Sequence, residues 1–128
     1  KQERRKSTKY IMNILGLAIA GAIGTVCRYE IGKIITYQQF PVATLFINTL
    51  GSLLLGFLFV KYATNQQQLF VILGIGFCGG FTTFSTFSLD LFKMLQTQQY
   101  FNFATYLSLS IILGLIGVFA GTYLAKLV

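Results

Sequence analysis

The sequence predicts an all-α integral membrane protein with four transmembrane helices, the third of them broken at mid-membrane. The 128 residues are 55% apolar and only 10% charged, whereas soluble domains are about a quarter charged. The mean hydropathy is +0.70. A membrane-spanning helix needs roughly 20 mostly apolar residues. Four such runs are present, at about 11–31, 42–60, 69–92 and 100–124, and the third contains residues that form poor helix.

The basic residues are distributed unevenly along the chain. Five of them precede the first run, so we expect residues 1–10 to form a basic cytoplasmic tail and 11–128 a single four-helix transmembrane domain. Four spans place both termini on the same side of the cell membrane. Seven bases then lie on that side, at Lys1, Arg4, Arg5, Lys6, Lys9, Lys61 and Lys126. Only Lys33 and Lys93 flank the opposite side, which predicts cytoplasmic termini.

The residues that are missing exclude several functions. The chain has no histidine, and its only acids are Glu3, Glu30 and Asp90. It therefore has no paired carboxylates, no Ser/His/Asp set and no metal-ligand cluster, and we expect no enzymatic activity. The placement of the bases beside membrane spans argues against nucleic acid as a partner. Cys27 and Cys78 lie inside apolar runs, which predicts buried free thiols.

The first span carries a row of small residues that ends in an arginine. Gly16, Ala20, Gly24 and Arg28 recur every four residues and so share one helix face. Small residues at this spacing allow helices to pack closely. Arg28 either extends to the membrane surface or, because it continues the packed face, points to protein or a water-filled vestibule.

The second span has a polar stripe, formed by Thr44, Asn48, Ser52 and Gly56. An asparagine in the middle of a membrane helix is costly unless it has partners. The stripe therefore either lines a polar path or bonds a neighbouring helix. We favour the lining role because Thr44 lies one turn from Asn48.

The fourth span combines hydroxyl groups and glycines. Tyr106, Ser110 and Gly114 share one face and offer two hydroxyl donors to whatever they contact. Gly117 and Gly121 form a G-x-x-x-G pair, which is typical of close helix packing. This pattern alone is a weak indication of function.

The third span contains the least regular sequence. Its first part, "LFVILGIGF", is compatible with an ordinary helix, but a glycine pair follows and then five hydroxyl residues, Thr82, Thr83, Ser85, Thr86 and Ser88. The sequence predicts a break at this motif, with Thr82, Thr83 or Ser85 capping the second half. A break in lipid exposes backbone groups that can coordinate ions.

Two phenylalanines follow the predicted break. Phe84 and Phe87 are three residues apart and so lie on a similar face of a helix. The edge of a phenyl ring carries partial positive charge, so rings presented edge-on can stabilise a small anion. The alternative is that both rings belong to the core.

Three motifs together resemble one family, the Fluc/CrcB fluoride channels. "GGFTTFSTFS" resembles its third-span signature, and "GTVCRY" is similar to its G-x-x-x-R motif. "PVATLFINTLGS" is similar to its second-span motif, with Ala43 where glycine is usual. The resemblance covers all four spans in order.

The resemblance implies a fluoride channel that exports cytoplasmic fluoride as an antiparallel, dual-topology-type dimer. It implies a central structural sodium ion held by backbone carbonyls, which in this chain belong to Gly79 and Thr82. It also implies a fluoride pathway and a vestibule arginine, matched by Phe84, Phe87, Asn48, Thr44, Tyr106, Ser110 and Arg28. Gly114 stands where the family often has serine.

Charge bias complicates the simplest dimer. A dual-topology homodimer requires a weak orientation signal, whereas seven bases against two is a strong one. We therefore hypothesise a homologous partner with the opposite bias. One alternative is a non-conducting partner subunit. A small proton-coupled multidrug exporter would need a carboxylate within the membrane. We take Glu30 as its only candidate, and its position at a span edge beside Lys33 argues against this alternative.

Overall fold

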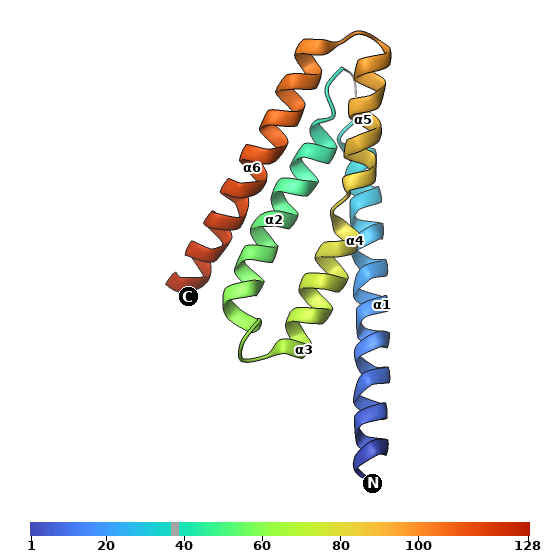
Figure 1. The fold of residues 1–128 in the computed structure, drawn as a ribbon, viewed down its shortest axis with the longest axis vertical. Helices are drawn as coiled ribbons and strands as arrows, with labels where there is room; N and C mark the ends of the chain where they lie inside the picture. The colour runs from blue at the N-terminus through green and yellow to red at the C-terminus, as the bar shows by residue number, and fades with distance from the viewer. Residues whose placement is uncertain (37–38) are drawn as a thin grey trace.

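The computed structural model describes residues 1–36 and 39–128 and shows an all-helical bundle (Figure 1). Among the described residues, four helical segments are long and apolar enough to cross a membrane, which confirms the predicted fold class for a single chain. The elements are α1 (Gln2–Ile34), α2 (Val42–Tyr62), α3 (Gln67–Phe70), η1 (Val71–Cys78), α4 (Gly79–Phe81), α5 (Phe84–Gln96) and α6 (Tyr100–Leu127). The segment from α3 to α5 forms the third span.

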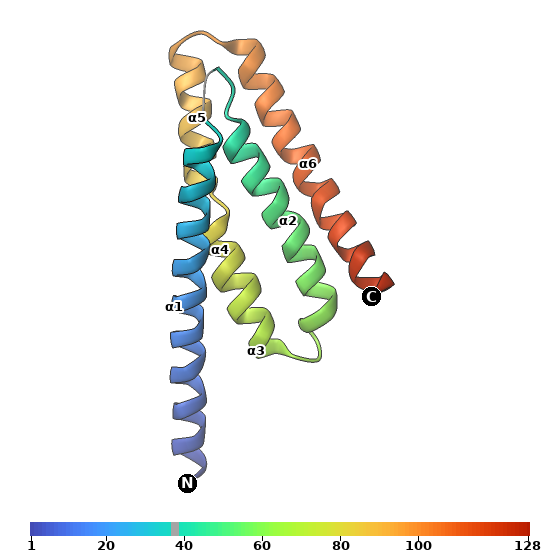
Figure 2. The same cartoon turned by 180° about the vertical axis from the view of Figure 1, so that it is seen from behind.

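Helix α1 is longer than the apolar run that predicts it. It begins at Gln2 rather than near residue 11, so the basic residues continue the membrane helix without interruption. Its first turns extend beyond the end of α3 in both views (Figures 1 and 2). The helix starts early because residues 2–10 include good helix formers such as Arg and Lys and no Pro or Gly.

The third span is interrupted, as the sequence predicts. Thr82 and Thr83 are extended, with ψ of 159° and 115°, between α4 and α5. The glycine pair itself is helical, so the break lies two residues after it. Before the glycines, where the sequence is compatible with an ordinary helix, Val71–Cys78 forms the wider π-helical segment η1.

Close backbone contacts hold the first half of the third span against α1. A Cβ added to Gly24 would overlap the carbonyl oxygen of Phe77, and one added to Gly80 would overlap that of Gly21. At Gly16 the added atom would lie 2.8 Å from Cδ1 of Ile72. The predicted packing face of the first span is therefore confirmed, and the figures show the two segments side by side (Figures 1 and 2).

Glycines also bring α2 and α6 together. Gly56 of α2 contacts the backbone of Val118, and Gly121 of α6 contacts the carbonyl of Leu53. A Cβ at Gly117 would lie 2.9 Å from the carbonyl oxygen of Thr49. The G-x-x-x-G pair thus packs helices, as predicted.

The second half of the third span packs through side chains instead. Phe87, Met94 and Tyr106 are buried together between α5 and α6. The turn that joins these helices places Gln98 in the left-handed region, at φ of 57°. The amides of Gln98 and Gln99 donate to the carbonyls of Leu95 and Met94, which is the Schellman arrangement at a helix C-terminus.

Candidate functional site

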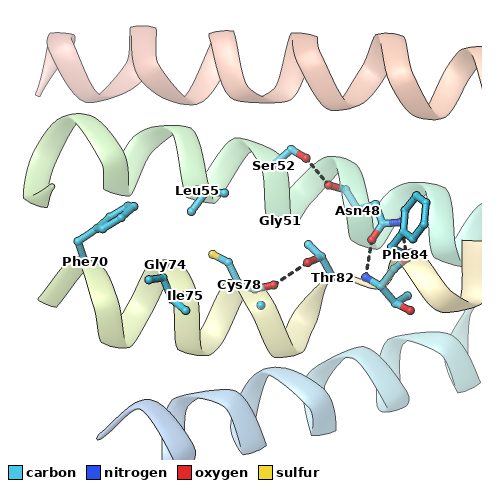
Figure 3. A pocket seen from close by; sticks show the side chains of 12 residues that line it. Asn48, Gly51, Ser52, Leu55, Phe70, Gly74, Ile75, Cys78, Thr82 and Phe84 are labelled. Atoms are coloured by element: carbon cyan, nitrogen blue, oxygen red, sulfur yellow. Dashed lines mark hydrogen bonds between the residues drawn. The ribbon is translucent and has the colours of Figure 1, made fainter. Parts of the chain in front are cut away.

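The break in the third span is held by one side chain of α2. The Asn48 amide nitrogen donates to the Thr83 carbonyl over 3.1 Å, and the Thr83 amide donates to the Asn48 side-chain oxygen over 2.8 Å. Figure 3 shows Asn48 reaching from α2 to this point. Backbone groups released in lipid must find partners within the protein, and Asn48 supplies a donor and an acceptor together. One N–H of its amide remains for a further partner.

Two other groups complete the junction. The Thr83 side chain accepts from the amide of Thr86 over 3.1 Å, which makes Thr83 the N-cap of α5 and confirms one of the three predicted candidates. On the other side of the break, the Gly80 carbonyl accepts from Arg28 Nε over 3.1 Å and from the Thr25 hydroxyl over 3.4 Å. Both ends of the interrupted helix are therefore capped by side chains.

These caps release two carbonyl groups. In a continuous helix the amides of Thr83 and Thr86 would bond the carbonyls of Gly79 and Thr82, four residues earlier. Both amides donate to side chains instead. An atom placed at Cβ of Gly79 would have no neighbour within 4 Å among the described residues. Gly79 and Thr82 thus offer uncommitted hard oxygen donors, the type that suits a small hard cation.

A cavity of about 540 Å³ lies between α2 and the first half of the third span. Asn48, Ser52, Gly79, Thr82 and Thr83 supply its polar wall. Several hydroxyls in this region satisfy themselves locally: Ser52 donates to the Asn48 carbonyl, and Thr82 to the Cys78 carbonyl, each over 2.8 Å. Phe84 lines the same cavity, and Figure 3 shows its ring beside Asn48. We call this the groove cavity.

A second cavity, of about 300 Å³, opens on the opposite side of the break. Arg28 and Lys33 line it, together with the hydroxyl residues Thr44, Thr83 and Thr86. Its two bases give it positive charge, and we call it the vestibule cavity. Thr83 borders both this cavity and the groove cavity. Lys33 also pairs with Glu30 over 3.2 Å at the protein surface.

The two phenylalanines of the motif occupy different environments. Their ring centroids lie 5.8 Å apart, but Phe84 is 79% exposed whereas Phe87 is 9% exposed. The Phe87 ring meets Tyr106 edge-to-face at 5.1 Å. Tyr106 is fully buried and donates its hydroxyl to Asp90 over 3.2 Å. Phe84 thus presents its ring outward from one chain, while Phe87 is packed within it.

Most of the predicted site residues converge on the break. Arg28 and Thr44 line the vestibule cavity, and Asn48, Gly79, Thr82 and Phe84 line the groove cavity. Phe87 and Tyr106 lie in the adjoining core. Ser110 follows Tyr106 by one turn of α6, is partly buried, and lines neither of these two cavities. These positions leave the functional role of each residue a prediction.

Sequence reasoning missed two residues at this site. The sequence predicts Thr83 only as a possible cap, yet it borders both cavities and bonds Asn48. Asp90 has no predicted role, although it is the one acid that falls inside the predicted 69–92 span. Glu30, the predicted exporter carboxylate, is exposed and ion-paired. The position of Asp90 within an apolar run was the available signal.

Together these features define a multi-pass membrane transport protein. An interrupted span with free carbonyls and side-chain caps is an arrangement in which membrane proteins bind and pass ions. The described residues contain no group of three or more His, Cys, Asp or Glu side chains that could bind a metal.

Comparison with known proteins identifies the particular family. The model of the CrcB-like protein family, Camphor Resistance (CrcB), matches residues 15–122, and the chain belongs to this family. It is 38% identical over 111 residues to "Fluoride-specific ion channel FluC 2" of Rhodococcus jostii, covering 86% of this chain and 96% of that protein. It is 39% identical over 121 residues to "Fluoride-specific ion channel FluC" of Leptospira interrogans, covering 89% and 94%. The predicted family is confirmed.

Proposed function

We propose that this chain is a subunit of a fluoride-specific ion channel and not an enzyme. The observation that carries this proposal is the interrupted third span, where the Phe84 ring and uncharged donors gather around two cavities that share Thr83. Relatives that match most of the chain bear the name of fluoride-specific channels.

Fluoride is small and strongly hydrated, so a selective pore must replace its water with fixed donors. The remaining N–H of Asn48 and the hydroxyls of Thr44 and Thr83 can act in this way at the break. The edges of Phe84 and Phe87 add partial positive charge without a full charge. We place Tyr106 and Ser110 further along the same pathway and Arg28 in the vestibule.

The direction of transport follows from the membrane potential. Neutral HF crosses lipid and releases fluoride in the cytoplasm, and a potential of 100 mV, negative inside, supplies about 2.3 kcal/mol for expelling one anion. Because the ion must also leave the pore, an uncharged lining suits rapid passage better than a deep row of lysines. Passive efflux of this kind lowers fluoride toxicity.

A second subunit is needed to close the pathway. The Phe84 ring is 79% exposed and Gly79 is open on one side of the single chain, so the wall is incomplete. We propose an antiparallel dimer in which carbonyls of Gly79 and Thr82 from both subunits hold a sodium ion. Bound sodium would supply positive charge that fixes the interrupted segments at the interface.

We also propose an orientation and a type of partner for this chain. The start of α1 and the ends of α2 and α6 lie at the same end of the bundle (Figure 1). The last turns of α2 and α6 carry Lys61 and Lys126, and we propose that this basic end is cytoplasmic. Such a bias favours a homologous partner that inserts the other way. Such a pair has two pores, and fluoride passes either through the pore lined by this chain or only through that of its partner.

Ion flux from liposomes tests the channel proposal. We expect voltage-driven fluoride efflux with no measurable chloride efflux. Replacing both Phe84 and Phe87 by Ile should reduce fluoride flux about tenfold or more, because the partial positive charge of the ring edges is lost. Leu127→Ile is the control, because Leu127 is exposed on α6 and lines neither of the two cavities. Proton-coupled movement of organic cations without fluoride flux would contradict the proposal.

Co-expression tests the partner. We expect this chain alone to yield little fluoride flux, and the chain purified with a homologue of opposite charge bias to yield robust flux. In the co-purified pair, replacing Phe84 and Phe87 in this chain alone reports whether its own pore conducts. Robust flux from a purified homodimer would refute the requirement for a different partner.

A further inference from the structure

A third cavity, unrelated to the break, lies where the first and third spans meet the basic end of the protein. It measures about 460 Å³ and is bordered by one cation and a ring of amide side chains. Its lining residues are Lys9, Asn13, Asn65, Gln66, Gln67, Gln68 and Val71. A cluster of five carboxamides beside a lysine offers many hydrogen-bond donors and acceptors in one place. The proposed ion pathway uses none of these residues.

Asn13 gives the strongest sign that this cavity binds something. Its side-chain oxygen is buried and accepts no hydrogen bond from any described residue. A buried acceptor without a partner costs about 1–3 kcal/mol, so it favours a ligand that brings a hydroxyl or ammonium donor. Asn13 lies one turn beyond Lys9 on α1, and both border the cavity.

The region around the cavity is strongly basic. Lys1, Arg5 and Lys9 recur every four residues and share one face of α1, with Arg4 and Lys6 beside them. At 33 residues and 1.5 Å per residue, α1 is about 50 Å long, well above the roughly 30 Å hydrocarbon core. Both views show that the start of α1 extends beyond α3 (Figures 1 and 2), and we expect these basic turns to reach through the headgroup layer. This position favours an anionic ligand.

An apolar surface adjoins the polar cavity. A neighbouring cavity of about 390 Å³ shares Gln66 and Gln68 with it and is otherwise lined by Leu69 and Ile72. A polar chamber next to apolar walls matches a phospholipid, whose headgroup and acyl chains need these two environments, better than a free phosphate ion.

We propose that this cavity binds an anionic glycerophospholipid whose headgroup carries a hydroxyl, of the phosphatidylglycerol type. The phosphodiester accepts from Lys9 and from the amide groups of Gln66 and Gln67. The Asn13 amide, whose oxygen is buried in this conformation, turns toward the cavity and accepts a hydrogen bond from the headgroup hydroxyl. An acyl chain lies along Leu69 and Ile72. Bound lipid thereby ties the start of the third span to α1.

Native mass spectrometry of the purified protein tests this proposal with matched lipids. Phosphatidylglycerol, phosphatidylmethanol and phosphatidylcholine of identical acyl chains are added separately, and soluble glycerol phosphate serves as the arm without a lipid anchor. We expect phosphatidylglycerol to bind about fivefold more tightly than phosphatidylmethanol, which lacks the headgroup hydroxyl. We expect weaker binding of phosphatidylcholine and no retained glycerol phosphate.

Two substitutions assign the contacts. Lys9→Gln should weaken phosphatidylglycerol binding about fivefold, the effect of one base near an anionic lipid. Asn13→Leu should abolish the preference for phosphatidylglycerol over phosphatidylmethanol while leaving the shared affinity. Lys126→Gln removes a base from the exposed end of α6 on the same side and is the control; circular dichroism verifies that each variant is folded.

The proposal is overturned if phosphatidylcholine binds as tightly as phosphatidylglycerol, or if Lys9→Gln and Lys126→Gln have equal effects. Retention of the hydroxyl preference in a folded Asn13→Leu variant also overturns it, as does tight binding of soluble glycerol phosphate. These readouts do not depend on fluoride flux, so their failure is distinguishable from failure of the channel proposal.

Discussion

The two halves of the third span are held in different ways. Before the break, η1 and α4 lie against α1 with backbone next to backbone, because Gly24 and Gly80 leave no side chain between them. After the break, α5 packs through Phe87 and Met94 against Tyr106 of α6. The first half is therefore fixed by backbone contacts at glycines, and the second half by packed side chains.

This difference explains where the span is interrupted. A glycine contact fixes the distance and the rotation of a helix strictly, whereas side-chain packing tolerates small adjustments of both. The two halves therefore need not share one helix axis, and the chain changes direction between them at Thr82 and Thr83. The Asn48 side chain hydrogen-bonds the Thr83 amide and carbonyl, which lack helical partners at this point. Substitutions in each half should thus have unequal effects.

The largest expected effect is in the glycine-packed half. Gly80→Ala would bring a Cβ onto the backbone carbonyl of Gly21, and backbone cannot move aside as a side chain can. We expect a loss of about 3 kcal/mol or more in stability, seen as a lowered unfolding temperature in detergent. Gly32→Ala on α1 is the control, because an added Cβ would meet no described atom within 4 Å. Equal stability of the two variants would contradict the packing argument.

A smaller effect is expected at the junction itself. Asn48→Leu removes the donor and the acceptor that pair with the Thr83 backbone. Because Thr83 borders the groove cavity, we expect the lower end of the cost of an unsatisfied group, about 1 kcal/mol for each of the two. We expect reduced stability and loss of fluoride flux. Ser52→Ala, one turn away in the same cavity, removes a hydroxyl that bonds a helical carbonyl and should cost less than about 1 kcal/mol of stability. If Asn48→Leu unfolds no more readily than Ser52→Ala, the clamp is not structural.

The smallest effect is expected at Thr83, the cap of the side-chain-packed half. Thr83→Val removes the cap on the Thr86 amide, which costs about 1 kcal/mol. Thr83→Ser retains a hydroxyl and should restore most of the stability. The unfolding temperatures of the three proteins give the comparison directly. A Ser variant as unstable as the Val variant would assign the effect to the threonine methyl group instead.

Sequence patterns predicted much of this arrangement because they report on local requirements. The four-residue spacing of Gly16, Ala20 and Gly24 indicated a packing face, and the hydroxyl-rich motif indicated a break. Membrane spans can be predicted from the sequence because each helix must satisfy its own backbone hydrogen bonds in lipid. The chain's family was likewise legible from three short motifs, and the family match confirms it.

The sequence by itself determined the four spans, the small-residue faces and the presence of a break. Only the tertiary structure decided that the break falls after the glycines rather than at them, because Gly80 is required for contact with α1 rather than for a turn. It also separated Phe84 from Phe87, since one faces outward and the other meets Tyr106. Periodicity places residues on one helix face, but the neighbouring helices determine what each residue contacts.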